Sequence, residues 1–142
     1  MKITLFTTNQ ARHNYLVNLL SNIATELNVV QEIKTIVTEI VPDHYSASSV
    51  MKEYFAKVIY AQKKIFGNSS ISAKNKNINL LPLENGDLNK CSTEFLSDFL
   101  KSDVYIIFGS SYIKGDLLDF LVNHKAINIH MGVSPYYRGT DC

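Results

Sequence analysis

A nearly unbroken apolar run at 103–108, DVYIIF, restricts the fold of this chain more than any other segment. Such a run is typical of a parallel strand covered by helices on both faces, since a strand with one face in water alternates apolar and polar residues. The run ends at Gly109-Ser110-Ser111, which suits a loop at the carboxyl end of a strand. It therefore predicts a central strand in a parallel sheet.

The rest of the chain alternates between strand and helix patterns. Further strands are expected at 2–8, 33–40, 78–83 and 126–130, where β-branched and apolar residues concentrate. Helices are expected along the apolar positions from Tyr15 to Leu27, over 48–66, from Ser92 as N-cap to Leu100, and over 116–121. The pattern predicts one domain over 1–142, an α/β, Rossmann-like, mostly parallel sheet with helices on both faces.

Apolar positions in the predicted helices indicate which sides face the core. In the first helix the stripe is Tyr15, Leu16, Leu19, Leu20, Ile23, Ala24 and Leu27. In the helix after Ser92 it is Phe95, Leu96, Phe99 and Leu100. Ligands of such sheets bind beyond the carboxyl ends of the strands, which directs attention to 8–13, 108–112 and 128–139.

Composition excludes several classes of protein. The 142 residues carry a formal net charge of +1, so we expect neither a nucleic-acid nor a membrane partner. The apolar run at 3–6 is too short for a signal peptide or a bilayer span. Cys91 and Cys142 have neither zinc-like nor CxxC spacing, so we expect free thiols in a reducing cytoplasm and no metal.

The most informative segment begins at Asn128-Ile129-His130. Side chains alternate along a strand, so the carboxamide and the imidazole lie on one face and can act on one substrate atom. Asn128 can donate to a developing oxyanion, and His130 can polarise the same oxygen or move a proton. The turn that follows contains Gly132, Pro135 and the string Tyr137-Arg138-Gly139.

This string resembles the active-site segment of the formyltransferases that use 10-formyltetrahydrofolate, and the order of strands and helices before it fits the same family. The resemblance implies that Asn128 and His130 are catalytic and stabilise the tetrahedral oxyanion formed when an amine attacks the formyl carbon. It also implies a catalytic aspartate some tens of residues after the histidine, which Asp141 is too near to match. We therefore expect that the last strands of the domain are missing and that activity is impaired.

The loop after the central strand resembles the family's pterin-lining segment. The resemblance assigns donor binding to Phe108, Gly109, Ser110, Tyr112 and Ile113, through backbone amides that meet the ring. The plain alternative for Phe108 is a core residue of the strand.

The loop after the first strand carries Asn9, Gln10, Arg12 and His13 at the start of a helix, where amides and dipole favour an anion. A cation is unfavourable in the first helical turn, so Arg12 suggests contact with an anion. His13 fits either a ligand contact or a packing role. The arrangement resembles the bacterial nucleotide-sugar N-formyltransferases of surface polysaccharide (O-antigen) synthesis, which implies a nucleotide-linked amino-dideoxy sugar as substrate.

Other functions stay open to different degrees. A nicotinamide-binding enzyme needs a glycine-rich turn after the first strand, and TTNQAR has no glycine. Methionyl-tRNA and glycinamide ribonucleotide formyltransferases are alternatives within the family. From a different class, a non-catalytic fragment that at most binds ligand is the main rival. An uncovered sheet edge also makes a homodimer possible.

Overall fold

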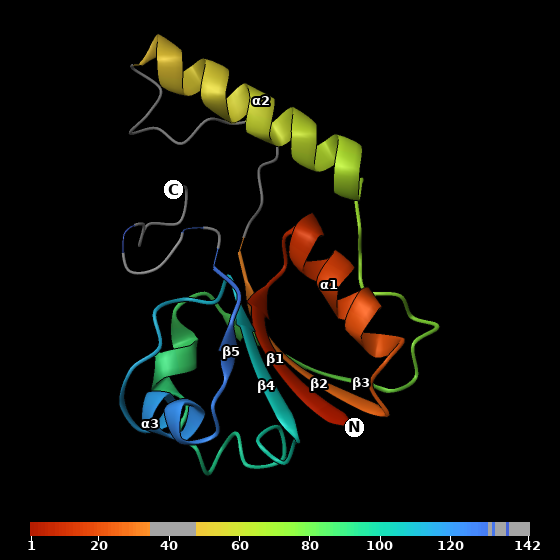
Figure 1. Cartoon of the computed structure of the whole chain (residues 1–142), viewed down its shortest axis with the longest axis vertical. Helices are drawn as coiled ribbons and strands as arrows, with labels where there is room; N and C mark the ends of the chain where they lie inside the picture. Colours follow the sequence, from red (N-terminus) through yellow and green to blue (C-terminus); the bar gives the residue numbers. More distant parts are fainter. Residues whose placement is uncertain (35–47, 131, 133–135, 137–142) are drawn as a thin grey trace.

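The computed structural model describes residues 1–34, 48–130, 132 and 136 (Figure 1). They form a five-stranded, wholly parallel sheet with the order β3-β2-β1-β4-β5. The strands are β1 (Lys2–Thr8), β2 (Glu26–Ile33), β3 (Ile78–Glu84), β4 (Val104–Phe108) and β5 (Ile127–Asn128). The helices are α1 (Ala11–Ser21), α2 (Ser49–Phe66), α3 (Gly115–Asn123) and a 3₁₀ helix, η2 (Asp87–Lys90). The α/β, Rossmann-like class expected from the sequence is confirmed.

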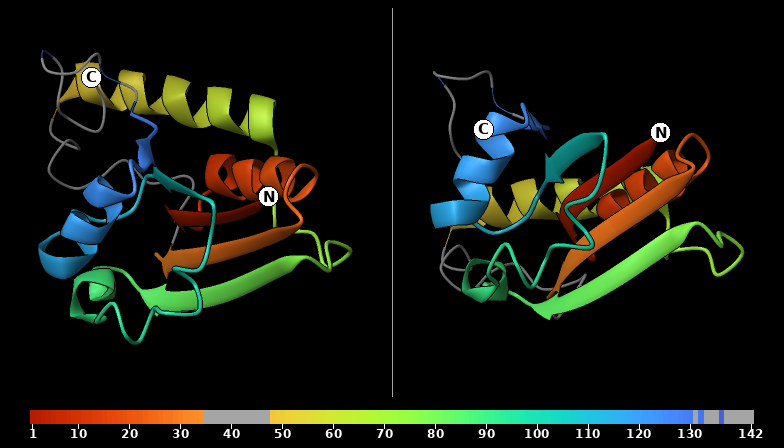
Figure 2. Two further views of the ribbon diagram at one scale, coloured as in Figure 1. Left: turned by 60° about the horizontal axis from the view of Figure 1, so that its bottom comes forward. Right: turned by 90° about the horizontal axis from the view of Figure 1, so that it is seen from below.

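Helices cover the two faces of the sheet, and each face has its own core. Figure 1 and Figure 2 show α1 on one side of the sheet and α3 on the other. In β1, Leu5 packs with Val17 of α1, whereas the neighbouring Phe6 packs with Leu96 and Leu117 on the opposite face. The alternation of side chains along a strand therefore divides the core into two.

The strand order reverses between β1 and β4. The chain moves outward from β1 to β2 and β3, then returns to the other side of β1 to form β4 and β5. Loops that leave β1 and β4 diverge at this point, and a crevice for ligands opens between them in sheets of this kind. The fold thus places the loop after Thr8 beside the loop after Phe108.

The expected second strand was wrong in its position. Strand β2 occupies Glu26–Ile33, α1 ends at Ser21, and Leu27 is a strand residue rather than part of a helical stripe. The segment 35–40 of the expected strand lies outside the described residues. Pairing with β1 on one side and β3 on the other buries β2, which overrides its weak local pattern.

The polar residues of β2 prevented its prediction as a strand, because such residues are unusual in a strand buried on both faces. Each one is hydrogen-bonded inside the protein. Asn28 accepts from Asn79 Nδ2 at 2.9 Å, and Gln31 donates to the carbonyl oxygen of Thr8 at 3.1 Å. Glu32 accepts from two loops. Buried polar groups are tolerated when their partners are supplied in this way.

Two helical stripes also need correction. In α1, Val17 and Leu20 are buried, but the predicted core residues Tyr15, Leu19 and Ile23 are 43%, 47% and 64% exposed. Residues 93–100 form hydrogen-bonded turns instead of a helix, although the Ser92 hydroxyl accepts from the Phe95 amide as expected of a cap. Leu96 and Leu100 are buried there, whereas Phe95 is 60% exposed. The turns bring the two leucines onto the core without completing a helix.

Helix α2 is confirmed between its predicted ends. The Ser48 hydroxyl accepts from the amide of Met51 at 3.3 Å, and Gly67 ends the helix with φ of 57°. Its apolar side is not buried in the core, however, since every residue of α2 is at least partly exposed. The helix lies beyond α1, over the carboxyl ends of the strands (Figure 1). None of the helices in the described part of the chain is long and apolar enough to cross a membrane.

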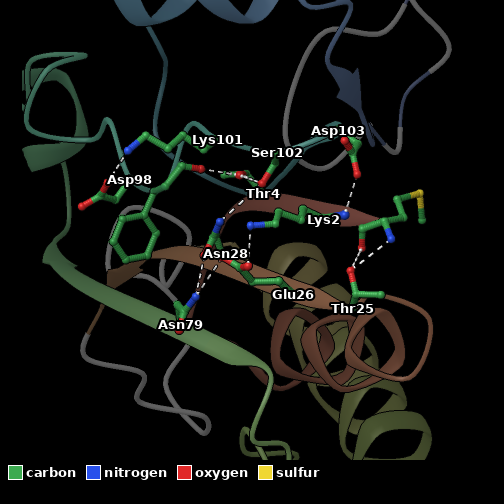
Figure 3. A network of polar contacts seen from close by, with 12 residues as sticks. Lys2, Thr4, Thr25, Glu26, Asn28, Asn79, Asp98, Lys101, Ser102 and Asp103 are labelled. Carbon is green, nitrogen blue, oxygen red and sulfur yellow. Dashed lines mark hydrogen bonds and ion pairs between the residues drawn. The ribbon is translucent and has the colours of Figure 1, made fainter.

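Polar side chains close the opposite, amino-terminal edge of the sheet by pairing with one another (Figure 3). Lys2 forms an ion pair with Glu26 at 2.8 Å, and its amide donates to Asp103 at 2.8 Å. At the same edge, the hydroxyl of Thr4 donates a hydrogen bond to the hydroxyl of Ser102 at 2.8 Å. This edge also encloses a hollow of about 470 Å³, but the groups that line it already have protein partners.

Candidate functional site

The three segments singled out in the sequence meet at the carboxyl edge of the sheet. The loop at 9–10 follows β1, the loop at 109–114 follows β4, and 129–130 follow β5. Since β4 pairs with β1 on one side and with β5 on the other, these ends are adjacent. Ile107 is the partner of Asn128, and the Ile129 amide donates to the Ile107 carbonyl at 2.9 Å, which extends the pairing toward His130.

A groove of about 520 Å³ runs between α1 and α2 and adjoins all three segments. Arg12 comes from the start of α1, Phe108 from the end of β4, and Ile129 from the segment after β5. The walls are largely apolar and include the rings of Tyr15, Tyr54 and Phe66. Apolar residues of α2 therefore line a groove instead of joining the core.

His13 lies inside the protein at the base of this region, with only 2% of its surface exposed. Arg12 Nε donates to its Nε2 at 3.3 Å, so the ring proton sits on Nδ1 and is donated to the hydroxyl of Thr8 at 2.5 Å. The edge of the ring meets Phe108, with centroids 4.6 Å apart. Burial, together with the charges of Arg12 and Lys34, lowers the pKa of His13 to about 4. The imidazole is therefore neutral at pH 7 and packed.

Gly109 makes room for that imidazole. A Cβ atom at this position would lie 2.5 Å from His13 Nε2 and 2.7 Å from Cε1. The residue also adopts a φ of 73°, which side chains disfavour. Gly109 was predicted to meet the formyl donor, and in this structure it joins the β4 loop to the first loop through His13.

The other predicted substrate residues differ in the hydrogen bonds that their side chains already form within the protein. Asn9 exchanges two hydrogen bonds of 3.0 Å with the backbone of Lys34, which ties the first loop to the end of β2. Gln10 is the N-cap of α1, but its side chain forms no capping bond, and its carbonyl accepts from the amides of His13 and Asn14. Arg12 lines the groove with no acidic residue in the first turn of α1 beside it. Arg12 is thus the member of this set best placed for an anion.

The loop after β4 is held by Glu32, which the sequence analysis did not identify. Its fully buried carboxylate accepts from the amide and hydroxyl of Ser111 and from the amide of Gly86. The Ser110 hydroxyl lies 3.2 Å from the Ser111 carbonyl oxygen. No local signal in the sequence reveals this role, because the partners of Glu32 lie 54 and 79 positions away along the chain.

The remaining predicted donor-binding residues lie further along the same loop. Ile113 is 8% exposed and belongs to the core, while Tyr112 is 79% exposed. The Lys114 ammonium lies 5.8 Å from the centre of the Tyr112 ring. Phe108 packs on the core, as its plain alternative predicts, and it also lines the groove. Its contact with the formyl donor stays a prediction.

Asn128 and His130 are both exposed at the edge of the sheet. Ile129 between them lines the groove, whereas Asn128 and His130 are not among its lining residues. His130 Nδ1 lies 3.0 Å from both the amide nitrogen and the carbonyl oxygen of Gly132. Pro135 and Tyr137-Arg138-Gly139 of the motif lie outside the described residues. Within the described residues no cluster of three or more His, Cys, Asp or Glu could hold a metal ion.

No protein-family model matches this sequence. A comparison with curated proteins finds no match either. Among solved structures, the chain is similar to phosphoribosylglycinamide formyltransferase from Anaplasma phagocytophilum, with a TM-score of 0.47 and 14% sequence identity. The match covers 98% of this chain and 53% of that one, so this chain spans about half the length of that structure.

Proposed function

We propose that this protein transfers a formyl group from 10-formyltetrahydrofolate to the amine of a nucleotide-linked amino-dideoxy sugar. The observation that carries the proposal is the groove between α1 and α2, because it is lined by Arg12 and Phe108, from the segments that the sequence assigns to substrate and formyl donor, and by Ile129, which lies between Asn128 and His130. A two-substrate reaction requires these segments to share one space, since the reacting atoms must approach within about 3–3.5 Å.

Asn128 and His130 supply the chemistry in this proposal. The Asn128 amide donates to the oxygen of the tetrahedral intermediate, which carries the charge that develops as the amine attacks. When the Gly132 amide donates to His130 Nδ1, Nε2 carries a ring proton that can be donated to the same oxygen. The amine loses a proton as the new carbon–nitrogen bond forms, and the folate nitrogen gains one as its bond to the formyl carbon breaks, so that tetrahydrofolate leaves.

Arg12 and the groove favour an anionic substrate that has an aromatic part. Among the described residues that line the groove there is one cation, Arg12, and no acidic residue, which suits a diphosphate. The rings of Tyr15 and Phe66, with centroids 5.5 Å apart, form part of the apolar wall against which a nucleobase can stack. These features support a nucleotide-linked substrate in the groove.

A formyl-transfer assay tests the proposal. The purified chain is incubated with 10-formyltetrahydrofolate and a panel of nucleotide-linked 3-amino and 4-amino sugars, and products are weighed by mass spectrometry. We expect a product heavier by one formyl group, and His130→Ala should abolish it. His124→Ala is the matched control, because His124 is also an exposed histidine but lies at the end of α3, stacked on Phe120.

A second candidate is a chain that binds these ligands without turnover. It is favoured by the exposure of both Asn128 and His130 at the sheet edge, since catalytic groups act best where water is excluded. Binding of the nucleotide sugar in calorimetry without any formylated product would support this candidate. Absence of both binding and product would contradict both proposals.

A further inference from the structure

We propose that Glu32 is a positioning residue that fixes the shape of the loop after β4 and thereby sets the affinity for the formyl donor, without touching it. The inference rests on the proposed function, which assigns donor binding to this loop. The side chain is fully buried, in the next-to-last residue of β2.

The carboxylate connects the ends of three strands through hydrogen bonds. Oε2 accepts from the Ser111 amide at 2.6 Å, and Oε1 accepts from the Ser111 hydroxyl at 2.7 Å and from the Gly86 amide at 2.8 Å. Gly86 follows β3 and Ser111 follows β4, while Glu32 itself is the next-to-last residue of β2. Hydrogen bonds to an ionised acceptor are about twice as strong as those between neutral groups, so this contact is stronger than an ordinary loop contact.

The sheet order explains why the β4 loop needs such a contact. Strands β2 and β4 are not neighbours, because β1 lies between them. With neighbouring strands about 4.8 Å apart, Ser111 must lie across the end of β1 to reach Glu32. Gly109, with its φ of 73°, allows the turn that starts this crossing. The loop is therefore folded over the point where the strand order reverses, which is where ligands of such sheets bind.

A carboxylate is suited to this task in a way that its amide is not. Its two oxygens can accept all three hydrogen bonds, whereas Gln offers one acceptor oxygen and adds an NH₂ donor. In Glu32→Gln, that NH₂ would face either the Ser111 amide or the Gly86 amide, so one donor would lose its partner. We expect the loop to leave its position over β1 while the rest of the sheet stays folded.

The experiment combines two ligand titrations with amide hydrogen exchange on Glu32→Gln. Calorimetry with tetrahydrofolate should show a loss of affinity of about tenfold, which is within the range seen for residues that act through others. The affinity for a nucleotide-linked amino sugar, which is assigned to Arg12 and the groove, should change by less than about twofold, because distant sites with no shared partners act nearly independently. The Ser111 amide should exchange faster, since its acceptor is lost.

Controls separate this role from a general loss of stability. Glu26→Gln changes the same residue type in the same strand, but at the partly exposed amino end where Glu26 pairs with Lys2, and it should affect neither titration. Ser111→Ala removes one of the three hydrogen bonds and should weaken tetrahydrofolate binding in the same direction by a smaller factor. This milder variant keeps the test available if Glu32→Gln does not fold.

Specific outcomes would overturn the inference. Unchanged tetrahydrofolate affinity with faster Ser111 exchange would show that the contact holds the loop without serving the donor. Equal losses for both ligands would indicate a general effect of the substitution on the fold. A wild-type chain that binds no tetrahydrofolate would contradict the proposed function itself, and with it the role of Glu32 in binding. The exchange rate of Ser111 would still report whether Glu32 holds the loop, so the two failures are distinguishable.

Discussion

Replacing Gly109 with alanine should destabilise the protein by two separate mechanisms. The backbone there has a φ of 73°, where a residue with a Cβ is disfavoured by about 1–2 kcal/mol. The added Cβ would also lie 2.5 Å from His13 Nε2, and overpacking of this kind costs about 1–3 kcal/mol. His13 cannot swing away cheaply, because it is 2% exposed and hydrogen-bonded through both ring nitrogens.

The sum is a loss of about 2–5 kcal/mol in the free energy of unfolding, or a Tm lower by roughly 6–15 °C for a domain of this size. Urea denaturation of the two proteins measures it. Gly115→Ala is the matched control, since Gly115 has a φ of 59° but no atom within 4 Å of an added Cβ. It should lose only the backbone part, about 1–2 kcal/mol.

A double-mutant cycle with His13→Ala isolates the steric part. Without the imidazole, Gly109→Ala should cost no more than Gly115→Ala, which gives a coupling between positions 13 and 109 of about 1–3 kcal/mol. If Gly109→Ala costs the same in both backgrounds, the close approach of His13 to Gly109 is not what requires glycine. If it costs no more than Gly115→Ala in the wild type, the reasoning is refuted as well.

Three further predictions concern other contacts. The pKa of His13 falls to about 4 in the fold from an ordinary value of 6.5, so its contribution to stability is complete above pH 6.5 and is lost as the pH falls toward 4. Urea titrations should show this loss as about 3 kcal/mol relative to His13→Gln, with stability falling on acidification. Arg12→Ala should weaken calorimetric binding of the nucleotide sugar by about tenfold, as expected for loss of a charge-assisted contact, while Lys57→Ala on the exposed side of α2 leaves it unchanged. Leu96→Ala should lower the free energy of unfolding by about 2–5 kcal/mol, because Leu96 is fully buried in the core under α3, and an undiminished urea midpoint would contradict that placement.

Much of the fold could be predicted because local patterns and tertiary structure agree. The apolar run that became β4 is paired on both sides, and α2 occupies Ser49–Phe66, within the range that its sequence predicted. Strand β2 could not be found in this way. Its polar residues are favourable only because partners from other segments, such as Asn79 for Asn28, reach them in the folded chain.

The candidate site, like the fold, could be predicted from the sequence only in part. Strand ends mark 8–13, 108–112 and 128–139 from sequence alone, and the parallel sheet brings the described parts of these segments to one edge. The contacts among these loops depend on residues distant in sequence, so no local pattern reveals them. Ser111 lies 79 positions from Glu32, for example. The role of His13 was left open between ligand contact and packing, and its burial against Gly109 favours packing.

The most direct test of the central proposal is to map where the two substrates bind, using the amide signals of the ¹⁵N-labelled chain in NMR. Tetrahydrofolate and a nucleotide-linked amino sugar are titrated separately. We expect tetrahydrofolate to shift the signals of 108–113 and 128–130, and the sugar nucleotide to shift those of 9–13 and of the helices that line the groove. Shifts confined to the amino-terminal edge around Lys2 and Asn79, or no shifts with either ligand at millimolar concentration, would contradict the proposal that this groove is the site of formyl transfer.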